Sequence, residues 1–259
     1  MTSESMPPEP PNAPFIYLAT PCFGGLVNIF FLRSVLDLQA ACEARGVGLH
    51  VELLSNDPLI TRARSRLAAR FLAHPKATHF LFVDADIGFS PAAVFRLLDC
   101  GKDVAGGVCP LKHIDWEKVR AAALSGTPAE GLMAKSVGYV VRFIPTADNS
   151  VEVEEGLARV SYVGTGFLMI SRGALQRVTD AHPELTADLS AVEPGADRTV
   201  MVYDTIVDGR NGEQLSEDYA FLRRWDALGG EVWADMESRF THVGHAAYSG
   251  SLIEAMRPG

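Results

Sequence analysis

The amino-acid sequence predicts an α/β protein with a doubly wound, mostly parallel central sheet flanked by helices. Short apolar segments alternate with helical patterns through about the first 110 residues, which is typical of parallel strands joined by helices. Such sheets are covered on both faces, so their strands are apolar throughout. The chain has 259 residues, 47% of them hydrophobic, which is enough to bury one sizeable core.

The first half supplies the parallel strands and the helices between them. Strands are predicted at 15–19, 49–53, 79–83 and 103–109, and helices at 28–45, 58–73 and 91–100. Gly46 is a stop signal for the first helix. Asp57 and Ser90, each followed by proline, are expected to cap the second and third. The ends of the strands should therefore meet at one edge of the sheet, where ligands bind in such folds.

The second half has a more mixed pattern and predicts a smaller lobe. Strands are expected at 137–143, 151–154, 158–163, 166–171, 232–233 and 240–243, with helices at 172–181 and 217–228. Residues 183–198 are polar and irregular. We expect one domain over 15–250, divided into halves at 15–112 and 113–250, with a disordered tail at 1–14 and a C-terminal tail at 251–259.

Composition excludes several classes of protein. The net charge of −9 argues against nucleic acid as a partner. The four cysteines form no C-x-x-C pair, which indicates reduced thiols in the cytoplasm. There is no signal peptide and no apolar run of membrane-spanning length, although peripheral contact with the inner face of the membrane remains open. The oligomeric state is not predicted.

Asp84 and Asp86 are the first candidate site. They follow the apolar strand 79–83, and two carboxylates at i and i+2 on extended chain point to one side. A divalent cation such as Mn²⁺ or Mg²⁺ would relieve their repulsion. The alternative is a solvated turn that precedes the next helix.

The segment 82–88, Phe-Val-Asp-Ala-Asp-Ile-Gly, after roughly eighty residues of alternating strands and helices, resembles the D-x-D site of GT-A glycosyltransferases. The resemblance extends from about Phe15 to Gly250. It implies a GT-A-like fold with an acceptor-side lobe, and transfer of a sugar from a nucleotide sugar, such as a UDP- or GDP-sugar, to a hydroxyl of a glycan, glycolipid or small molecule. It also implies that Asp86 binds the metal directly and that Asp84 is a further metal ligand, which lies nearer the donor ribose or sugar.

Glu217 and Asp218 are the second match. They begin the predicted helix 217–228 and resemble the Glu-Asp helix start of family 2-like transferases, in which a carboxylate deprotonates the acceptor. The resemblance implies that Asp218 is the catalytic base, with Glu217 as the substitute, and that the transfer inverts the anomeric centre. An ordinary acidic first turn of a helix is the simpler alternative.

Several further residues complete the candidate site. The resemblance implies a late histidine ligand to the metal, either His242 or His245, with His242 favoured. Gly164, Thr165 and Gly166 allow close approach of the backbone to a sugar, or form a bulge. Trp116 is either a sugar-stacking residue or a buried anchor. Thr20 and Pro21, at the end of the first strand, resemble the place where GT-A proteins hold the nucleotide base and ribose. Among Arg62, Arg66 and Arg70, which form a stripe on one helix face, Arg62 is expected to bind the diphosphate, while Arg64 lies off that stripe.

Other functions are less consistent with the sequence. A D-x-D phosphatase usually carries this motif at the start of its domain, with Thr or Val where Gly88 stands here. A nucleotidyltransferase would need a basic residue in the loop 20–25. A binding module on a GT-A fold, without catalysis, remains the main alternative, and turnover of a donor would distinguish the two.

Overall fold

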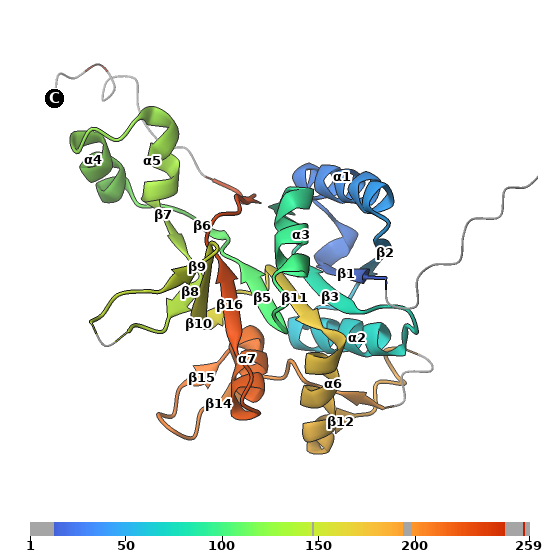
Figure 1. Ribbon diagram of the computed structural model, residues 1–259. Coiled ribbons are helices and arrows are strands. Elements are labelled where there is room, and N and C mark those ends of the chain that lie inside the picture. The colour runs from blue at the N-terminus through green and yellow to red at the C-terminus, as the bar shows by residue number, and fades with distance from the viewer. Residues whose placement is uncertain (1–12, 147, 194–197, 247–255, 257–259) are drawn as a thin grey trace, which may run out of the picture.

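A single large sheet forms the centre of the molecule (Figure 1). The computed structural model describes residues 13–146, 148–193, 198–246 and 256. Within them the strand order is β2-β1-β3-β11-β5-β16-β10-β8, with β9 added beside β10. The strands are β1 (Phe15–Cys22), β2 (Gly48–Ser55), β3 (His79–Val83), β5 (Val104–Gly107), β8 (Val141–Phe143), β9 (Val153–Glu154), β10 (Leu157–Val163), β11 (Phe167–Ser171) and β16 (Val232–Asp235).

The direction of the strands confirms the predicted sheet. β1 is parallel to β2 and β3, and β16 is parallel to β5. β11 lies between β3 and β5 and is antiparallel to both, so β3 and β5 still point the same way. β10 also runs against its neighbours β16 and β8. The sheet is therefore mostly parallel in direction, with β11 inserted at its middle.

Helices cover both faces of this sheet, as predicted for a doubly wound fold. On one face α1 (Ile29–Arg45) and α3 (Pro91–Asp99) pack over Ile16 and Leu18. On the other, α2 (Ile60–Ala73), α6 (Arg172–Ala181) and α7 (Glu217–Ala227) pack over Tyr17 and Ala19. Successive residues of β1 thus face opposite layers of the core, as the pleat of a strand requires.

Helix boundaries agree with their sequence signals except at α2. The Asn28 side chain caps α1, Gly46 ends it in the left-handed conformation at φ 68°, and the Ser90 side chain caps α3. The expectation that Asp57 caps α2 is wrong, because that helix begins at Ile60 and Leu59 holds the cap position. Asp57 instead accepts hydrogen bonds from Arg62 and Arg66.

A small helical lobe follows the first half and was not predicted. It contains α4 (Trp116–Leu124) and α5 (Ala129–Ser136), between β6 (Pro110–Ile114) and β7 (Val137–Tyr139). In Figure 1 this pair of helices projects away from the sheet. Short strands and turns complete the fold: β4 (Ile87–Gly88), β12 (Thr186–Ala187), β13 (Thr199–Val200), β14 (Ile206–Val207), β15 (Gln214–Leu215), β17 (Thr241–His242), η1 (Phe23–Gly25) and η2 (Pro183–Leu185).

The expected tails at 1–14 and 251–259 lie almost wholly outside the described residues. In the part of the chain that the structure describes, none of the helices combines the length and apolar character needed to cross a bilayer.

Candidate functional site

The Asp84-Ala85-Asp86 segment forms a turn at the carboxyl end of β3. The Asp84 N–H donates to the carbonyl of Gly166 (3.0 Å), and the Asp84 carbonyl accepts from Ile87 (3.0 Å). Extended chain would have placed both carboxylates on one side. Because the chain turns here, they point to different partners. Asp84 contacts Arg64, whereas Asp86 contacts Lys112 and His242.

Arg64 joins two carboxylates that are far apart in the sequence. Its Nη2 lies 3.0 Å from Asp84 Oδ1, and its Nε lies 3.4 Å from Glu217 Oε1. The Arg64 side chain is only 5% exposed, and its Nη1 has no hydrogen-bond partner in the described part of the chain. Burial alone would lower the pKa of Arg64, but the carboxylates of Asp84 and Glu217 outweigh burial and raise it, so the guanidinium is charged. The D-x-D turn and the start of α7 therefore form one site.

Asp86 lies in a second cluster, which β17 completes. The Val243 N–H donates to the Asp86 carbonyl (2.9 Å), so the strand that carries His242 is fixed beside the turn. Lys112 donates to Asp86 Oδ2, and His242 Nε2 lies 3.5 Å from Asp86 Oδ1. Burial would raise the pKa of Asp86, but these two partners lower it to about 2. Asp86 is therefore an anion at neutral pH.

The orientation of His242 determines whether a cation fits beside Asp86. His242 Nδ1 lies 2.7 Å from the carbonyl of Pro110, and since a carbonyl only accepts, Nδ1 carries the proton. Nε2 then faces Asp86: it donates to the carboxylate when the ring is protonated, and a cation that displaces this proton gains Nε2 as a ligand. Metal-binding histidines are commonly held by such an Nδ1–H bond. An imidazole nitrogen facing a carboxylate oxygen suits Mn²⁺, so these two residues fit a divalent cation if Lys112 gives way.

The predicted trio of metal ligands is not assembled by the protein alone. Among the described residues no three His, Cys, Asp or Glu side chains gather closely enough to hold a metal ion. Asp84, the expected third ligand, is bound by Arg64. Any remaining ligands would have to come from a bound phosphate or water. His245, the alternative late histidine, is exposed.

Asp218 is held by hydroxyl groups next to this site. Tyr162 and Ser216 each donate a hydrogen bond to its carboxylate, and the Tyr219 N–H donates to Asp218 Oδ1 (2.9 Å). Ser216 occupies the cap position of α7, as predicted, but its hydroxyl binds Asp218 and caps no helical N–H. Burial, and next to it Asp218, raise the pKa of Tyr162 far above its usual range, so its hydroxyl stays protonated and orients the carboxylate.

The glycine segment lies directly beside the D-x-D turn. A Cβ added at Gly166 would come within 3.3 Å of Asp84 Oδ2, so a side chain there would press on the carboxylate. Thr165 is buried, and the Gly164 N–H donates to the carbonyl of Val140 (3.2 Å). The segment precedes β11, which the sequence analysis placed correctly.

The other predicted contacts lie in different surroundings. Thr20 is fully buried within β1, and its hydroxyl has no hydrogen-bond partner among the described residues. Pro21 is half-buried beside it. Arg62 binds Asp57 through Nε (3.0 Å) and Nη2 (2.8 Å), which occupies much of its donor capacity. Trp116 is 72% exposed at the start of α4, so it is not a buried anchor.

Arg64, Lys112 and Tyr162 are the site residues that sequence analysis did not assign. Arg64 was set aside because it lies off the stripe formed by its neighbouring arginines. The hydroxyl of Tyr162 reaches Asp218 only because β10 and α7 pack together. The signal available for Lys112 was that it follows the predicted strand 103–109 closely, where site residues gather in such sheets.

Comparisons with known proteins find structural neighbours of low sequence identity and no relative by sequence. No protein-family profile matches the chain, and curated proteins include no relative similar to it in sequence. Solved structures similar to it include a protein from STIV (TM-score 0.48, 16% identity, 89% of this chain and 86% of the other). They also include the catalytic domain of Drosophila β1,4-galactosyltransferase 7 with xylobiose (0.46, 11%, 94% and 79%). A third is a putative glucose-1-phosphate thymidylyltransferase from Bacillus anthracis with sucrose (0.42, 11%, 89% and 89%).

Proposed function

We propose that this protein is a metal-dependent glycosyltransferase that transfers a sugar from a nucleoside-diphosphate sugar to an acceptor hydroxyl, with inversion at the anomeric carbon. The observation that supports the proposal best is the double contact of Arg64 with Asp84 and Glu217. It brings the carboxylates that follow β3 and those that begin α7 to one edge of the sheet. The carboxylates after β3, Asp84 and Asp86, are then available for donor binding. Those at the start of α7, Glu217 and Asp218, are available for proton abstraction.

Donor binding is assigned to the groups around the D-x-D turn. Asp86 and His242 would hold Mn²⁺ or Mg²⁺, which supplies Lewis-acid stabilisation of the leaving diphosphate. Asp84 lies nearer the donor ribose or sugar, at the end of β3. The orphan Nη1 of Arg64 and the orphan hydroxyl of Thr20 are buried donors that a bound nucleotide could satisfy. Arg62 remains a candidate phosphate contact, although Asp57 already binds it.

Acceptor activation is assigned to Asp218, with Glu217 as the substitute. A general base must be ionised and held in place, and the hydroxyls of Tyr162 and Ser216 orient the Asp218 carboxylate. Glu217 is bound by Arg64, which makes it the less available base. Gly164, Thr165 and Gly166 are the candidate sugar contacts, because Gly166 lets the backbone lie directly against Asp84, and Trp116 offers an exposed ring to an extended acceptor.

Thermal unfolding in the presence of nucleotides tests the donor site. UDP, GDP, CDP and dTDP would each be added at millimolar concentration with Mn²⁺, with Mg²⁺ or with EDTA. A ligand that binds only the folded state raises the melting temperature. At a hundred times its Kd, it adds about 2.7 kcal/mol to the free energy of unfolding. We expect one nucleotide to stabilise the protein only with metal, and Asp86→Ala to abolish the shift.

Asp99→Ala is the matched control, because it also removes a carboxylate that pairs with a basic side chain, Arg45, at 2.6 Å. It should keep the full nucleotide shift. Absence of any shift in the wild type, or an unchanged shift in Asp86→Ala, would contradict the assignment. Release of nucleoside diphosphate from the corresponding sugar donor then separates an enzyme from a binding module.

A further inference from the structure

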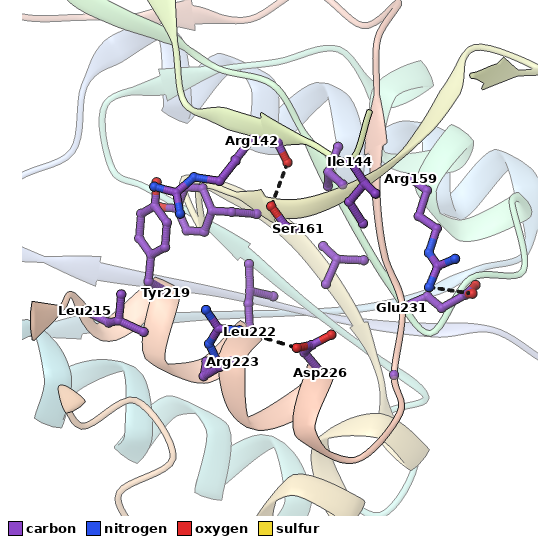
Figure 2. Close-up of a pocket in the computed structure, with 14 residues that line it drawn as sticks. Arg142, Ile144, Arg159, Ser161, Leu215, Tyr219, Leu222, Arg223, Asp226 and Glu231 are labelled. Carbon is purple, nitrogen blue, oxygen red and sulfur yellow. Dashed lines mark hydrogen bonds and ion pairs between the residues drawn. The ribbon is translucent and has the colours of Figure 1, made fainter. Parts of the chain in front are cut away.

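A crevice lies beside the candidate base, and the proposed reaction assigns no role to it. It lies between α7 and the strands β8 and β10, and the turn before β16 closes one end (Figure 2). Its walls include Ile144, Leu222 and Val232, which are apolar, and its cavity volume is about 80 Å³. On this measure a single water molecule needs about 10–15 Å³, so the crevice admits a small substituent and not a nucleotide.

Three guanidinium groups line this crevice in a chain whose net charge is −9. They belong to Arg142, Arg159 and Arg223, whereas Asp226 and Glu231 are the carboxylates of the lining. Arg159 is paired with Glu231 (3.2 Å). Arg223 contacts Asp226 (3.5 Å) and Asp208 (3.1 Å). Among the lining residues three guanidiniums therefore face two carboxylates, although the protein as a whole is acidic.

Arg142 supplies that excess. Within the described residues its guanidinium has neither a carboxylate partner nor a hydrogen bond, and it lies 5.5 Å from the centre of the Tyr219 ring. Figure 2 shows it beside this ring, at the opposite end of the crevice from Glu231. The Nε of Arg223 is also buried without a hydrogen-bond partner in the described part of the chain. Unused guanidinium donors are well suited to a carboxylate or phosphate.

The crevice is directly connected to the candidate base. Tyr162 and Tyr219, which line it, stack with their ring centres 3.2 Å apart and their planes at 8°. Tyr162 donates its hydroxyl hydrogen to Asp218, and Tyr219 follows Asp218 in the chain. A ligand group near Arg142 would therefore lie next to the tyrosine pair that positions Asp218. An acceptor anchored in the crevice could extend from there toward the base.

We infer that this crevice recognises an acidic group, a carboxylate or a phosphate, carried by the acceptor saccharide. Arg142 binds the acid, and the tyrosine pair contacts the attached sugar. The inference rests on the proposed function for its meaning in catalysis, but it predicts a binding preference that is measurable without turnover.

Matched acceptors test the inference directly. Binding of p-nitrophenyl β-D-glucuronide, p-nitrophenyl β-D-glucoside 6-phosphate and neutral p-nitrophenyl β-D-glucoside would be measured by titration calorimetry or ligand-observed NMR. The wild-type protein should bind at least one acidic glycoside about tenfold more tightly than the neutral one, and the better of the two identifies the acid. Arg142→Gln should remove this preference, whereas Arg120→Gln, on the exposed surface of α4, should retain it. Melting temperatures confirm that both variants are folded.

Equal binding of the acidic and neutral glycosides by the wild type would overturn the inference, as would an intact preference in Arg142→Gln. Release of nucleoside diphosphate from a sugar donor without acceptor is measured separately on the wild type. If donor turnover occurs without an acid preference, the inference fails and the proposed function stands. If an Arg142-dependent preference occurs without nucleotide binding, the crevice is confirmed and the proposed function fails.

Discussion

Two sets of arginines on α2 have opposite surroundings. Arg66 and Arg70 share Glu193, at 2.7 Å and 2.5 Å, and Arg62 and Arg66 share Asp57, at 2.8 Å and 2.9 Å. Arg70 also binds Glu52. This ion-pair network matches three guanidiniums with three carboxylates. Arg64, on the same helix, faces the candidate site instead.

The candidate site has more carboxylates than cations. Asp84, Asp86, Glu217 and Asp218 lie there with Arg64 and Lys112. Since like charges held close together are costly unless compensated, this excess favours binding of a cation, whereas the neutral network favours only stability. The balance of charge, and not the number of charged residues, therefore distinguishes the two regions.

Removal of the candidate base should have the largest effect. Asp218→Asn keeps the size of the side chain but cannot accept a proton, so we expect kcat to fall about 10²- to 10⁴-fold. Asp99→Asn, an exposed aspartate on α3, should leave kcat unchanged. Steady-state rates with the donor found by thermal shift provide the measurement. Near-normal activity in Asp218→Asn together with a large loss in Glu217→Gln would transfer the role of base to Glu217.

Disruption of the ion-pair network should reduce stability. Arg66→Met removes a partner of Asp57, whose side chain is 1% exposed, and we expect a loss of about 3 kcal/mol in the free energy of unfolding. Arg45→Met breaks an exposed pair with Asp99 and should cost less than about 1 kcal/mol. Urea titrations of both variants check this difference. Equal losses would show that burial of the network is not what stabilises it.

The network should also weaken in acid. Burial alone would raise the pKa of Asp57, but hydrogen bonds from Arg62 and Arg66 outweigh burial and lower it from 3.8. Because the folded pKa lies below the unfolded one, this contribution is present in full above the unfolded value and is lost as pH falls through the folded pKa. The stability difference between wild type and Asp57→Asn should therefore be constant near neutral pH and shrink below pH 3.8. A difference that grew on acidification would contradict the sign.

Substitution of Arg62 should have the smallest effect on activity. It tests whether Arg62 belongs to the ion-pair network alone or also to the candidate site. Its Asp57 partner leaves few donors free, so Arg62→Gln should raise the KM for the donor less than about threefold, while Arg64→Gln raises it more than about tenfold. Donor saturation curves for both variants provide the comparison. A larger effect for Arg62→Gln would return the main phosphate contact to Arg62.

Local signals predicted most of the fold. Asn28, Gly46 and Ser90 define the ends of their helices by side-chain or backbone chemistry that acts within a few residues. The insertion of β11 between β3 and β5 depends on pairing between segments more than 60 residues apart, which no local pattern encodes. The α4 and α5 pair was missed because an alanine-rich stretch gives little periodicity.

The candidate site was predicted in its carboxylates but not in its cations. Asp84, Asp86, Glu217 and Asp218 follow strand ends or begin helices, which are positions that a sequence can indicate. The choice between Arg62 and Arg64 depends on which face of α2 turns toward β3, and hence on tertiary packing. The regular spacing of Arg62, Arg66 and Arg70 drew the prediction to the face that the structure fills with ion pairs, while Arg64, which reaches Asp84, lies between them in the sequence.

β11 can pair with β3 and β5 only late in the synthesis of the chain. β3 and β5 are complete by residue 107, but the strand that joins them ends only at Ser171. During synthesis both strands therefore wait with unpaired edges, which are prone to aggregation, until more than sixty further residues have emerged. A gene fragment that stops at residue 112 would leave those edges open permanently. The segments on either side of residue 112 can thus be exchanged, in evolution or in engineering, only if β11 stays with the segment that it completes.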